Sequence, residues 1–295
     1  VADGYHGLRE LDERVALARH TVETRQESYR IFSRRHEVGA TSKLELTQVQ
    51  TLLTQAQALL AQLELARASQ LHALGQLIGA HPGPLPEAAP FDETLVLAEL
   101  APGLPSTLLV ARPDIAAAEH ALRGAHANIG AARAAFFPRI ALTGTWGSAS
   151  AELDGLFESG SRAWTFAPVL SLPIFDGGRR RANLDLSQIR RDIAVAEYEK
   201  NIQTAFREVA DALAARRWLG EQLQTARTAL DAQAERARLA QLRYDNGSAA
   251  YLEVLDAQRD LLAAEQQLVQ ARRALLSSQV ALYAALGGGT SVPTP

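Results

Sequence analysis

A long stretch without proline is the feature that most constrains this chain. Residues 176–245 contain no proline, and after the Gly177-Gly178 pair their only glycine is Gly220. A continuous helix over this stretch would be on the order of 100 Å long, which a globular domain cannot accommodate. We predict that this helix stops at Asn246-Gly247 and that a second helix of about 36 residues runs back from Leu252.

An internal repeat shows that this helical hairpin occurs twice. At an offset of 208, 14 of the 45 positions from Arg35 to Gly79 are identical to their counterparts between Arg243 and Gly287. Apolar residues step by three and four in each copy, which is typical of a coiled-coil seam. The seam residues are Leu46, Val49, Leu53, Ala56, Leu60 and Leu63, and then Val254, Ala257, Leu261, Ala264, Leu268, Ala271 and Leu275. Because copy two extends upstream over residues 112–215, we expect roughly a hundred residues of copy one to precede Val1.

Composition excludes several classes of protein. The 295 residues include no cysteine, and the formal net charge is -3. A disulfide framework and a thiolate nucleophile are therefore excluded, and nothing favours a nucleic-acid partner. The seven histidines lack metal-binding spacing, and no nucleophile elbow or phosphate-binding loop is present. Polar residues interrupt every apolar stretch before the roughly 18 residues of a membrane-spanning helix. We predict no enzyme, no catalytic, cofactor-binding or metal site, and no cofactor.

Residues 136–175 differ from the rest because their apolar residues alternate with a period of two. This period predicts two strands of about 9 to 11 residues, the length of a tilted membrane strand, joined by a solvated loop over 148–161. The apolar face is predicted to contact lipid, and it comprises Ile140, Leu142, Trp146, Trp164, Phe166, Leu170, Leu172 and Ile174. A hairpin packed on a helix in a soluble protein is the alternative. Two strands alone are marginal and lipid requires a closed sheet, so we expect a barrel shared between chains.

Several motifs together resemble the TolC-like outer membrane factor family, and most closely its efflux-associated, NodT-type branch. The resemblance covers about residues 8–287. It rests on Ala111-Arg112-Pro113-Asp114-Ile115, Ala118-Glu119, Ile129-Gly130-Ala131-Ala132-Arg133, Phe136-Phe137-Pro138, Leu172-Pro173-Ile174-Phe175-Asp176-Gly177-Gly178-Arg179, Arg243-Tyr244-Asp245-Asn246-Gly247 and Tyr251-Leu252-Glu253-Val254-Leu255-Asp256-Ala257-Gln258.

The resemblance implies a mainly helical fold with a small β part. Three chains would each give four strands to one outer-membrane barrel, above a trimeric α-barrel of long antiparallel helices in the periplasm. It implies a passive exit duct for small molecules, with a periplasmic adaptor protein and an inner-membrane pump of the RND type as partners. The expected parts are the periplasmic hairpin of repeat 1 (1–79), an equatorial linker (80–111), an upper helix (112–135), the membrane hairpin (136–175), the hairpin of repeat 2 (176–287) and a tail (288–295).

The two hairpin turns are predicted to form the periplasmic tip, which would meet the adaptor and form the gate. The candidate residues are Glu37, Gly39, Glu45, Asp245, Gly247, Tyr251 and Glu253. Some family members carry an aspartate two residues after the second turn glycine, where this chain has Ala249. An acidic constriction would therefore depend on Asp245, Glu253 or Asp256.

Three consecutive arginines follow the second strand. Arg179, Arg180 and Arg181 would lie at the periplasmic rim of the membrane, where cations at a helix N-terminus oppose the helix dipole. Lipid phosphate is one interpretation, and solvated charge is the other. For the whole chain, two alternatives to efflux stay open: an outer-membrane channel for type I protein secretion, and a soluble periplasmic coiled-coil adaptor.

Overall fold

The computed structural model describes residues 1–80, 91 and 112–288. Most of the predicted linker and tail therefore lies outside the described residues. The described elements are α1 (Ala2–Glu37), α2 (Lys43–Ile78), α4 (Pro113–Ala134), β1 (Arg139–Ser148), the short 3-10 helix η2 (Asp154–Phe157), β2 (Arg162–Ser171), α5 (Arg179–Asp245) and α6 (Tyr251–Ala285). The chain divides into two compact units, Val1–Gly103 with Arg207–Ser291, and Leu104–Phe206 with Val292–Pro295. The division falls within α5.

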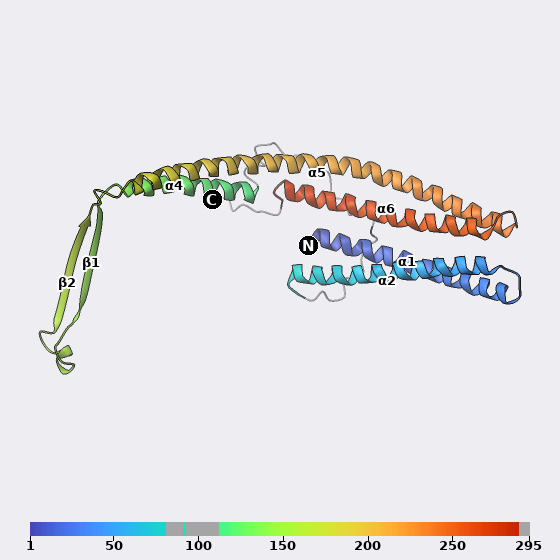
Figure 1. The fold of residues 1–295 in the computed structure, drawn as a ribbon, viewed down its shortest axis with the longest axis horizontal. Helices are drawn as coiled ribbons and strands as arrows, with labels where there is room; N and C mark the ends of the chain where they lie inside the picture. Colours follow the sequence, from blue (N-terminus) through green and yellow to red (C-terminus); the bar gives the residue numbers. More distant parts are fainter. Residues whose placement is uncertain (81–90, 92–111, 289–295) are drawn as a thin grey trace. The chain divides into compact units, whose positions relative to one another are not determined.

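The first unit is built from two antiparallel helical hairpins. Figure 1 shows α1 beside α2, and the end of α5 beside α6. The predicted seam of α2 is confirmed, because Val49, Leu53, Ala56 and Leu63 are all buried. In α6, Val254 and Ala257 pack against Ala240 of α5, as the coiled-coil pattern predicts.

A second seam on α6 joins the two repeats. Leu255 packs with Phe32 of α1 and Val49 of α2, while Val269 and Leu276 pack with Phe91 and the half-buried Leu17. The helix α1 accordingly contacts both α2 and α6. This seam was not predicted, although Leu255, Val269 and Leu276 are spaced by multiples of seven. Two apolar stripes on one helix mean that α6 packs against more than one neighbour.

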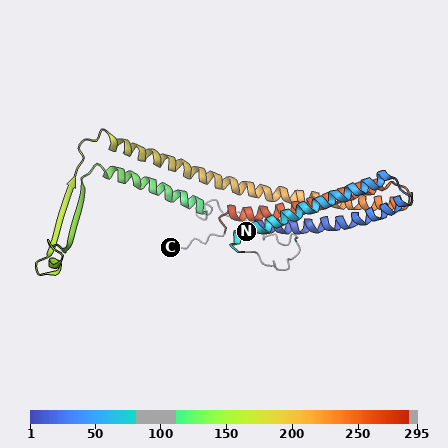
Figure 2. The same cartoon turned by 60° about the horizontal axis from the view of Figure 1, so that its bottom comes forward.

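Both hairpin turns begin with a glycine in the left-handed conformation. Gly39 has φ of 75° and Gly247 has φ of 69°, a region that side-chain-bearing residues rarely adopt. The amide of Gly39 donates to the His36 carbonyl, and that of Gly247 donates to the Tyr244 carbonyl, both at 2.9 Å. Figure 2 shows the two turns at the same end of this unit. The predicted helix stops are confirmed.

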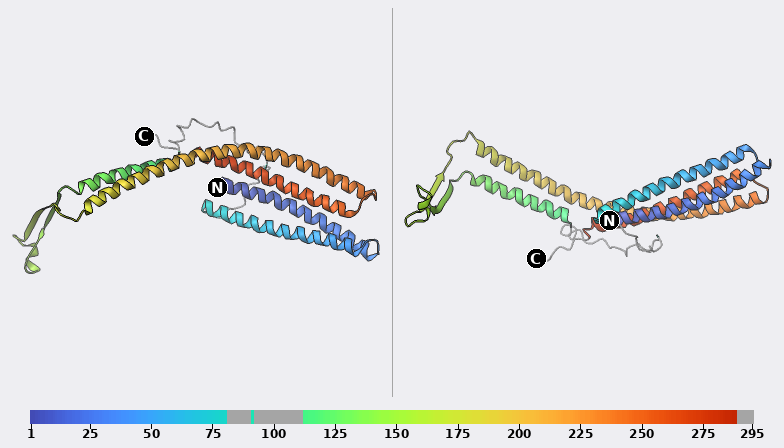
Figure 3. Two further views of the ribbon diagram at one scale, coloured as in Figure 1. Left: turned by 45° about the horizontal axis from the view of Figure 1, so that its top comes forward. Right: turned by 90° about the horizontal axis from the view of Figure 1, so that it is seen from below.

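The second unit contains α4, the first part of α5 and the strand pair. The helices α4 and α5 run in opposite directions, and the strands extend from their adjoining ends (Figure 3). The two strands are antiparallel, with Arg139 opposite Ser171 and Ser148 opposite Arg162. The prediction that Leu172 and Ile174 lie within the second strand is wrong, because β2 ends at Ser171. Pro173 has no amide hydrogen to continue the ladder, which favours this early end.

Candidate functional site

The strand register brings the predicted apolar residues of both strands onto one face. Ile140 lies opposite Leu170, Leu142 opposite Pro168, Gly144 opposite Phe166, and Trp146 opposite Trp164. Their side chains are largely exposed, with Ile140 at 70% and Trp146 at 80%. A contiguous exposed apolar surface of this kind marks a site of contact with lipid or another protein.

The opposite face of the strand pair consists mainly of small residues and threonines, and Val169 is its one larger apolar residue. Thr143 lies opposite Ala167, and the hydroxyl oxygens of Thr145 and Thr165 are 2.5 Å apart and share a hydrogen bond. The two faces therefore differ as the lipid and lumen faces of a membrane barrel strand would. Leu172 and Ile174 are also exposed, but they lie beyond the ladder.

Exposed aromatic residues lie near both ends of the strand pair. Trp146 and Trp164 pair near the loop, while Phe137 and Phe175 are exposed near the helices. The ten residues of β1, Arg139–Ser148, make nine steps and extend ~30 Å at ~3.3 Å per residue, or ~23 Å along the normal for a strand tilted by ~40°. This height matches the apolar band of about 25 Å between the two aromatic girdles of an outer-membrane barrel.

A side-chain cap organises the junction between β2 and α5. The Asp176 carboxylate accepts hydrogen bonds from the amides of Gly178 and Arg180, both at 3.2 Å, and from Arg180 Nε at 2.8 Å. The Arg180 guanidinium also lies over the ring of Phe136, 5.6 Å from its centroid. Of the three predicted rim arginines, Arg180 is therefore held by protein groups, while Arg179 and Arg181 are exposed.

The turn of repeat 1 is closed by a capping box. The Glu45 amide donates to Ser42 Oγ at 3.2 Å, and the Ser42 amide donates to the Glu45 carboxylate at 2.9 Å. The Thr41 hydroxyl donates to the same carboxylate at 2.6 Å. These hydrogen bonds, first from Thr41 and then from Ser42, hold the pKa of the Glu45 carboxyl below its ordinary value. The structure thus assigns Glu45 to the helix cap.

The turn of repeat 2 is organised differently. Its cap position is Ala250, which makes no side-chain hydrogen bond to the helix start. Glu253 instead pairs with Arg243, which also donates to the Ser248 carbonyl at 3.4 Å. Asp245 accepts a hydrogen bond from Gln241 Nε2 at 2.8 Å and is exposed.

An aromatic cluster joins the two turns. The Tyr251 ring lies 4.4 Å from the Phe32 ring and 4.9 Å from the Tyr244 ring, between centroids. Its hydroxyl donates to Ser28 Oγ at 2.9 Å, and burial raises its pKa above the ordinary value. Arg35 donates to the Tyr244 hydroxyl at 2.6 Å. Of these residues, only Tyr251 was predicted at the tip. Arg35 recurs as Arg243 and Tyr244 lies in a family motif, whereas Phe32 had no signal except its closeness to the turn.

Comparison with known proteins decides the family. The outer membrane efflux protein family matches residues 1–80 and 104–288. The chain belongs to this family. It is 49% identical over 290 residues to the toluene efflux pump outer membrane protein TtgF of Pseudomonas putida, covering 98% of this chain and 60% of that protein. It is 45% identical over 278 residues to the outer membrane protein OprJ of Pseudomonas aeruginosa, covering 94% of this chain and 58% of that protein.

Solved structures agree with this family. The open-state outer membrane channel MtrE of Neisseria gonorrhoeae matches with a TM-score of 0.83 and 39% identity, over 98% of this chain and 65% of that chain. The predicted family and the mainly helical fold with a small β part are therefore confirmed, as is an outer-membrane location with helices extending into the periplasm. The chain spans about three fifths of the length of the curated relatives it matches.

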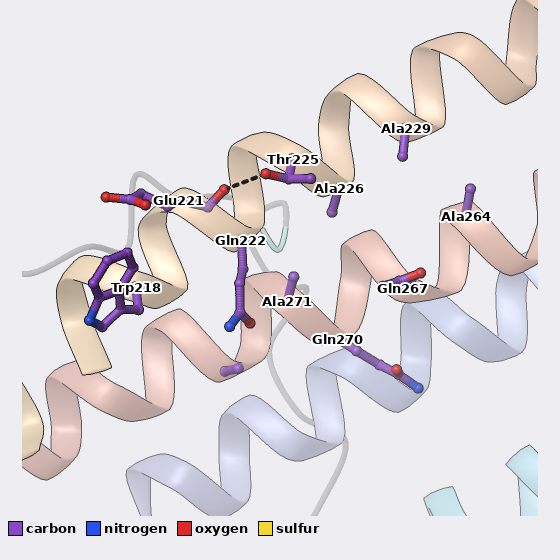
Figure 4. A pocket seen from close by; sticks show the side chains of 11 residues that line it. Trp218, Glu221, Gln222, Thr225, Ala226, Ala229, Ala264, Gln267, Gln270 and Ala271 are labelled. Atoms are coloured by element: carbon purple, nitrogen blue, oxygen red, sulfur yellow. Dashed lines mark hydrogen bonds between the residues drawn. The ribbon is translucent and has the colours of Figure 1, made fainter. Parts of the chain in front are cut away.

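Within this efflux family fold, α5 and α6 also form an alanine-lined groove. Figure 4 shows Ala226 and Ala229 of α5 facing Ala264 and Ala271 of α6, with Trp218 at one end. The groove has a volume of about 700 Å³. Small side chains at a helix contact leave room for another helix to approach closely.

In the described part of the chain, no group of three or more histidine, aspartate or glutamate side chains could hold a metal ion.

None of the described helices combines the length and the hydrophobicity needed to cross a bilayer.

Proposed function

We propose that this chain is part of the outer-membrane channel of a tripartite efflux system, a passive exit duct for small molecules. The observation that carries the proposal is the strand pair, whose apolar face is exposed and which has exposed aromatic residues near both ends. The names of the relatives support efflux, because TtgF is a toluene efflux pump protein of the outer membrane. They favour efflux over protein secretion and over a soluble adaptor.

The proposed assembly is a homotrimer. One strand pair leaves two unpaired edges, which hydrocarbon does not tolerate, so the sheet must be completed by other strands. In this proposal residues 136–175 contribute to a shared barrel, residues 112–135 lead to it, and residues 1–79 and 176–287 form helical hairpins in the periplasm. Outer-membrane lipid would contact the apolar face.

The partners in this proposal are a periplasmic adaptor protein and an inner-membrane pump of the RND type. The energy for transport would come from the pump, so the channel needs neither a catalytic residue nor a cofactor. The relatives' description as outer-membrane proteins of efflux pumps supports such a division of labour. We accordingly propose that the protein is not an enzyme.

The tip formed by the two turns is the proposed gate and adaptor contact. Glu37 and Asp245 are exposed at equivalent positions of the two repeats, whereas Glu45 is bound in a cap and Glu253 is paired with Arg243. An acidic constriction would therefore depend mainly on Asp245 and Glu37. Arg35 and Tyr244, which link the two repeats next to the turns, would hold the closed arrangement.

Spin labelling of the complete protein in lipid vesicles tests the strand assignment. Labels at Trp164, Phe166 and Leu170 should be more accessible to a lipid-soluble quencher than labels at Thr165 and Val169 on the opposite face. Thr165 lies between Trp164 and Phe166, and Val169 is next to Leu170 on the same strand. The two sets of labels therefore lie at similar depths, so depth alone cannot produce a difference in accessibility. Equal accessibility of the two sets would contradict the lipid-facing assignment and the channel with it.

A further inference from the structure

The two ends of the strand pair carry opposite charge. The loop between the strands contains Glu152, Asp154 and Glu158, all exposed, with Arg162 where β2 begins. The other end carries the exposed Arg133, Arg139, Arg179 and Arg181. Asp176, the one acidic residue of the junction between β2 and α5, forms an ion pair with Arg180. We call these four exposed arginines the basal arginines. The hairpin is therefore electrostatically polar along its length.

The contact between Arg180 and Phe136 joins two junctions into one corner, and the basal arginines lie in or next to these junctions. Phe136 lies in the junction from α4 to β1, and Arg180 lies in the first turn of α5, so their contact ties the two junctions together. Among the described residues, the side chain of none of the four basal arginines has an ion-pair or hydrogen-bond partner. Unpaired cations at the same end of the strand pair repel one another, and an anion between them would relieve this repulsion.

Large apolar side chains surround this corner. Phe137 is 71% exposed, Ile174 is 91% exposed and Phe175 is 92% exposed. Apolar and aromatic side chains combined with arginine are typical of the membrane interface, where rings lie at the headgroup level and guanidinium groups meet phosphate. The amides of Gly178 and Arg180 at the start of α5 already donate to the Asp176 carboxylate, so we do not place the anion at the helix N-terminus itself.

We propose that the basal arginines bind the phosphate groups of anionic phospholipids in the adjoining membrane leaflet. This inference rests on the proposed function, because it requires the strand pair to lie in a membrane. The four cations match an anionic headgroup, and the exposed rings would lie among its acyl chains. The acidic loop at the other end would repel the same lipid, so the arginines would also favour one orientation of the hairpin across the bilayer.

The roles of the three consecutive arginines separate in this proposal. Arg179 and Arg181 bind lipid, whereas Arg180 holds the corner through Asp176 and Phe136. Replacing Arg180 should therefore lower thermal stability without changing lipid preference. Replacing Arg179 and Arg181 should weaken the preference for anionic lipid without lowering thermal stability.

The test uses the complete protein in nanodiscs with equal amounts of phosphatidylethanolamine and phosphatidylglycerol. The fraction of each spin-labelled lipid immobilised by the protein gives the preference for the anionic lipid. In the double variant Arg179→Gln with Arg181→Gln, this preference should fall by about five-fold or more, since each arginine near a membrane surface contributes on the order of a five-fold change in affinity. The double variant with lysine at both positions should retain most of it.

Arg162→Gln is the matched control, because it removes an exposed arginine from the acidic end of the same strand pair. Its lipid preference should equal that of the wild type. Normal incorporation with an unchanged preference in the double glutamine variant would overturn the lipid-binding inference and leave the channel intact. Failure of the wild type to enter nanodiscs would instead overturn the proposed function.

Discussion

The two hairpin turns begin alike and then diverge. Both have a left-handed glycine and the same backbone hydrogen bonds, but Ser42 of repeat 1 corresponds to Ala250 of repeat 2. With the serine present, Glu45 closes a capping box. Where repeat 2 has alanine, the equivalent Glu253 forms an ion pair with Arg243. The hydroxyl groups of Thr41 and Ser42, which repeat 2 replaces with Ala249 and Ala250, thus distinguish the contacts of a glutamate common to both repeats.

The equivalent arginines diverge for the same reason. Arg243 is engaged within its own turn by Glu253, whereas Arg35 reaches across to the hydroxyl of Tyr244 in the other repeat. Repeat 1 therefore has a turn that is closed by its own side chains and an arginine available for a contact between repeats. Repeat 2 has a turn without a side-chain cap at the start of α6. The same backbone turn therefore supports different side-chain contacts in the two repeats.

The largest effect is expected from the residue that joins the two turns. Phe32 is 4% exposed and contacts Tyr251, while its counterpart in repeat 2, Ala240, is buried against Val254 and Ala257. Phe32→Ala should destabilise the tip by about 3 to 5 kcal/mol, through lost burial and the cavity left behind. Hydrogen exchange at residues 28–36 and 248–256 measures this loss.

Phe32→Leu is the control for that prediction, because it retains most of the buried volume and should cost clearly less. If Phe32→Ala accelerated hydrogen exchange only within repeat 1, the aromatic cluster would not couple the two repeats. Each turn would then be stabilised independently of the other.

The caps provide an intermediate effect of opposite sign in the two repeats. Ser42→Ala should destabilise the start of α2 by about 1 kcal/mol, the usual value of a lost N-cap. Ala250→Ser should stabilise the start of α6 by a similar or smaller amount, because Glu253 already occupies the position required for a capping box. Local hydrogen exchange at residues 43–46 and 251–254 measures both changes.

Acid distinguishes a cap effect from a general change in stability. The pKa of Glu45 is lowered in the folded state, so its contribution is present above its unfolded pKa of about 4.3 and is lost as pH falls through the lower, folded value. Wild-type exchange at residues 43–46 should therefore accelerate on going from pH 6 to pH 3 more than that of Glu45→Gln, after correction for intrinsic rates. Equal acceleration would show that the capping box is not formed in solution.

The smallest effect concerns the exposed acids at the ends of α1 and α5. Glu37→Gln and Asp245→Asn should lower the cation preference of the complete channel in single-channel recordings, each by under about 1 kcal/mol, because water and salt screen exposed carboxylates. Glu253→Gln should change the preference less, since Arg243 already compensates its charge. A larger effect of Glu253→Gln than of Asp245→Asn would place the constriction at Glu253.

Much of the architecture could be predicted from local pattern. The 67 residues of α5, the 35 residues of α6 and both glycine turns follow from the absence of proline, the steps of three and four, and the helix-stop signals. The strand pair and its apolar face follow from the two-residue period. These features depend on residues close together in the chain, so a single sequence contains the information.

Other features depended on the tertiary structure. The second seam of α6 required Phe32, Val49 and Leu17 to meet it from far along the chain, and no local period names those partners. The early end of β2 and the assignment of Arg180 to Asp176 and Phe136 likewise depend on where the chain turns. Sequence by itself determined which helices and strands form, because backbone hydrogen bonding and side-chain period are local. Only the folded structure decided which side chains meet between them, because packing and ion pairing act across space.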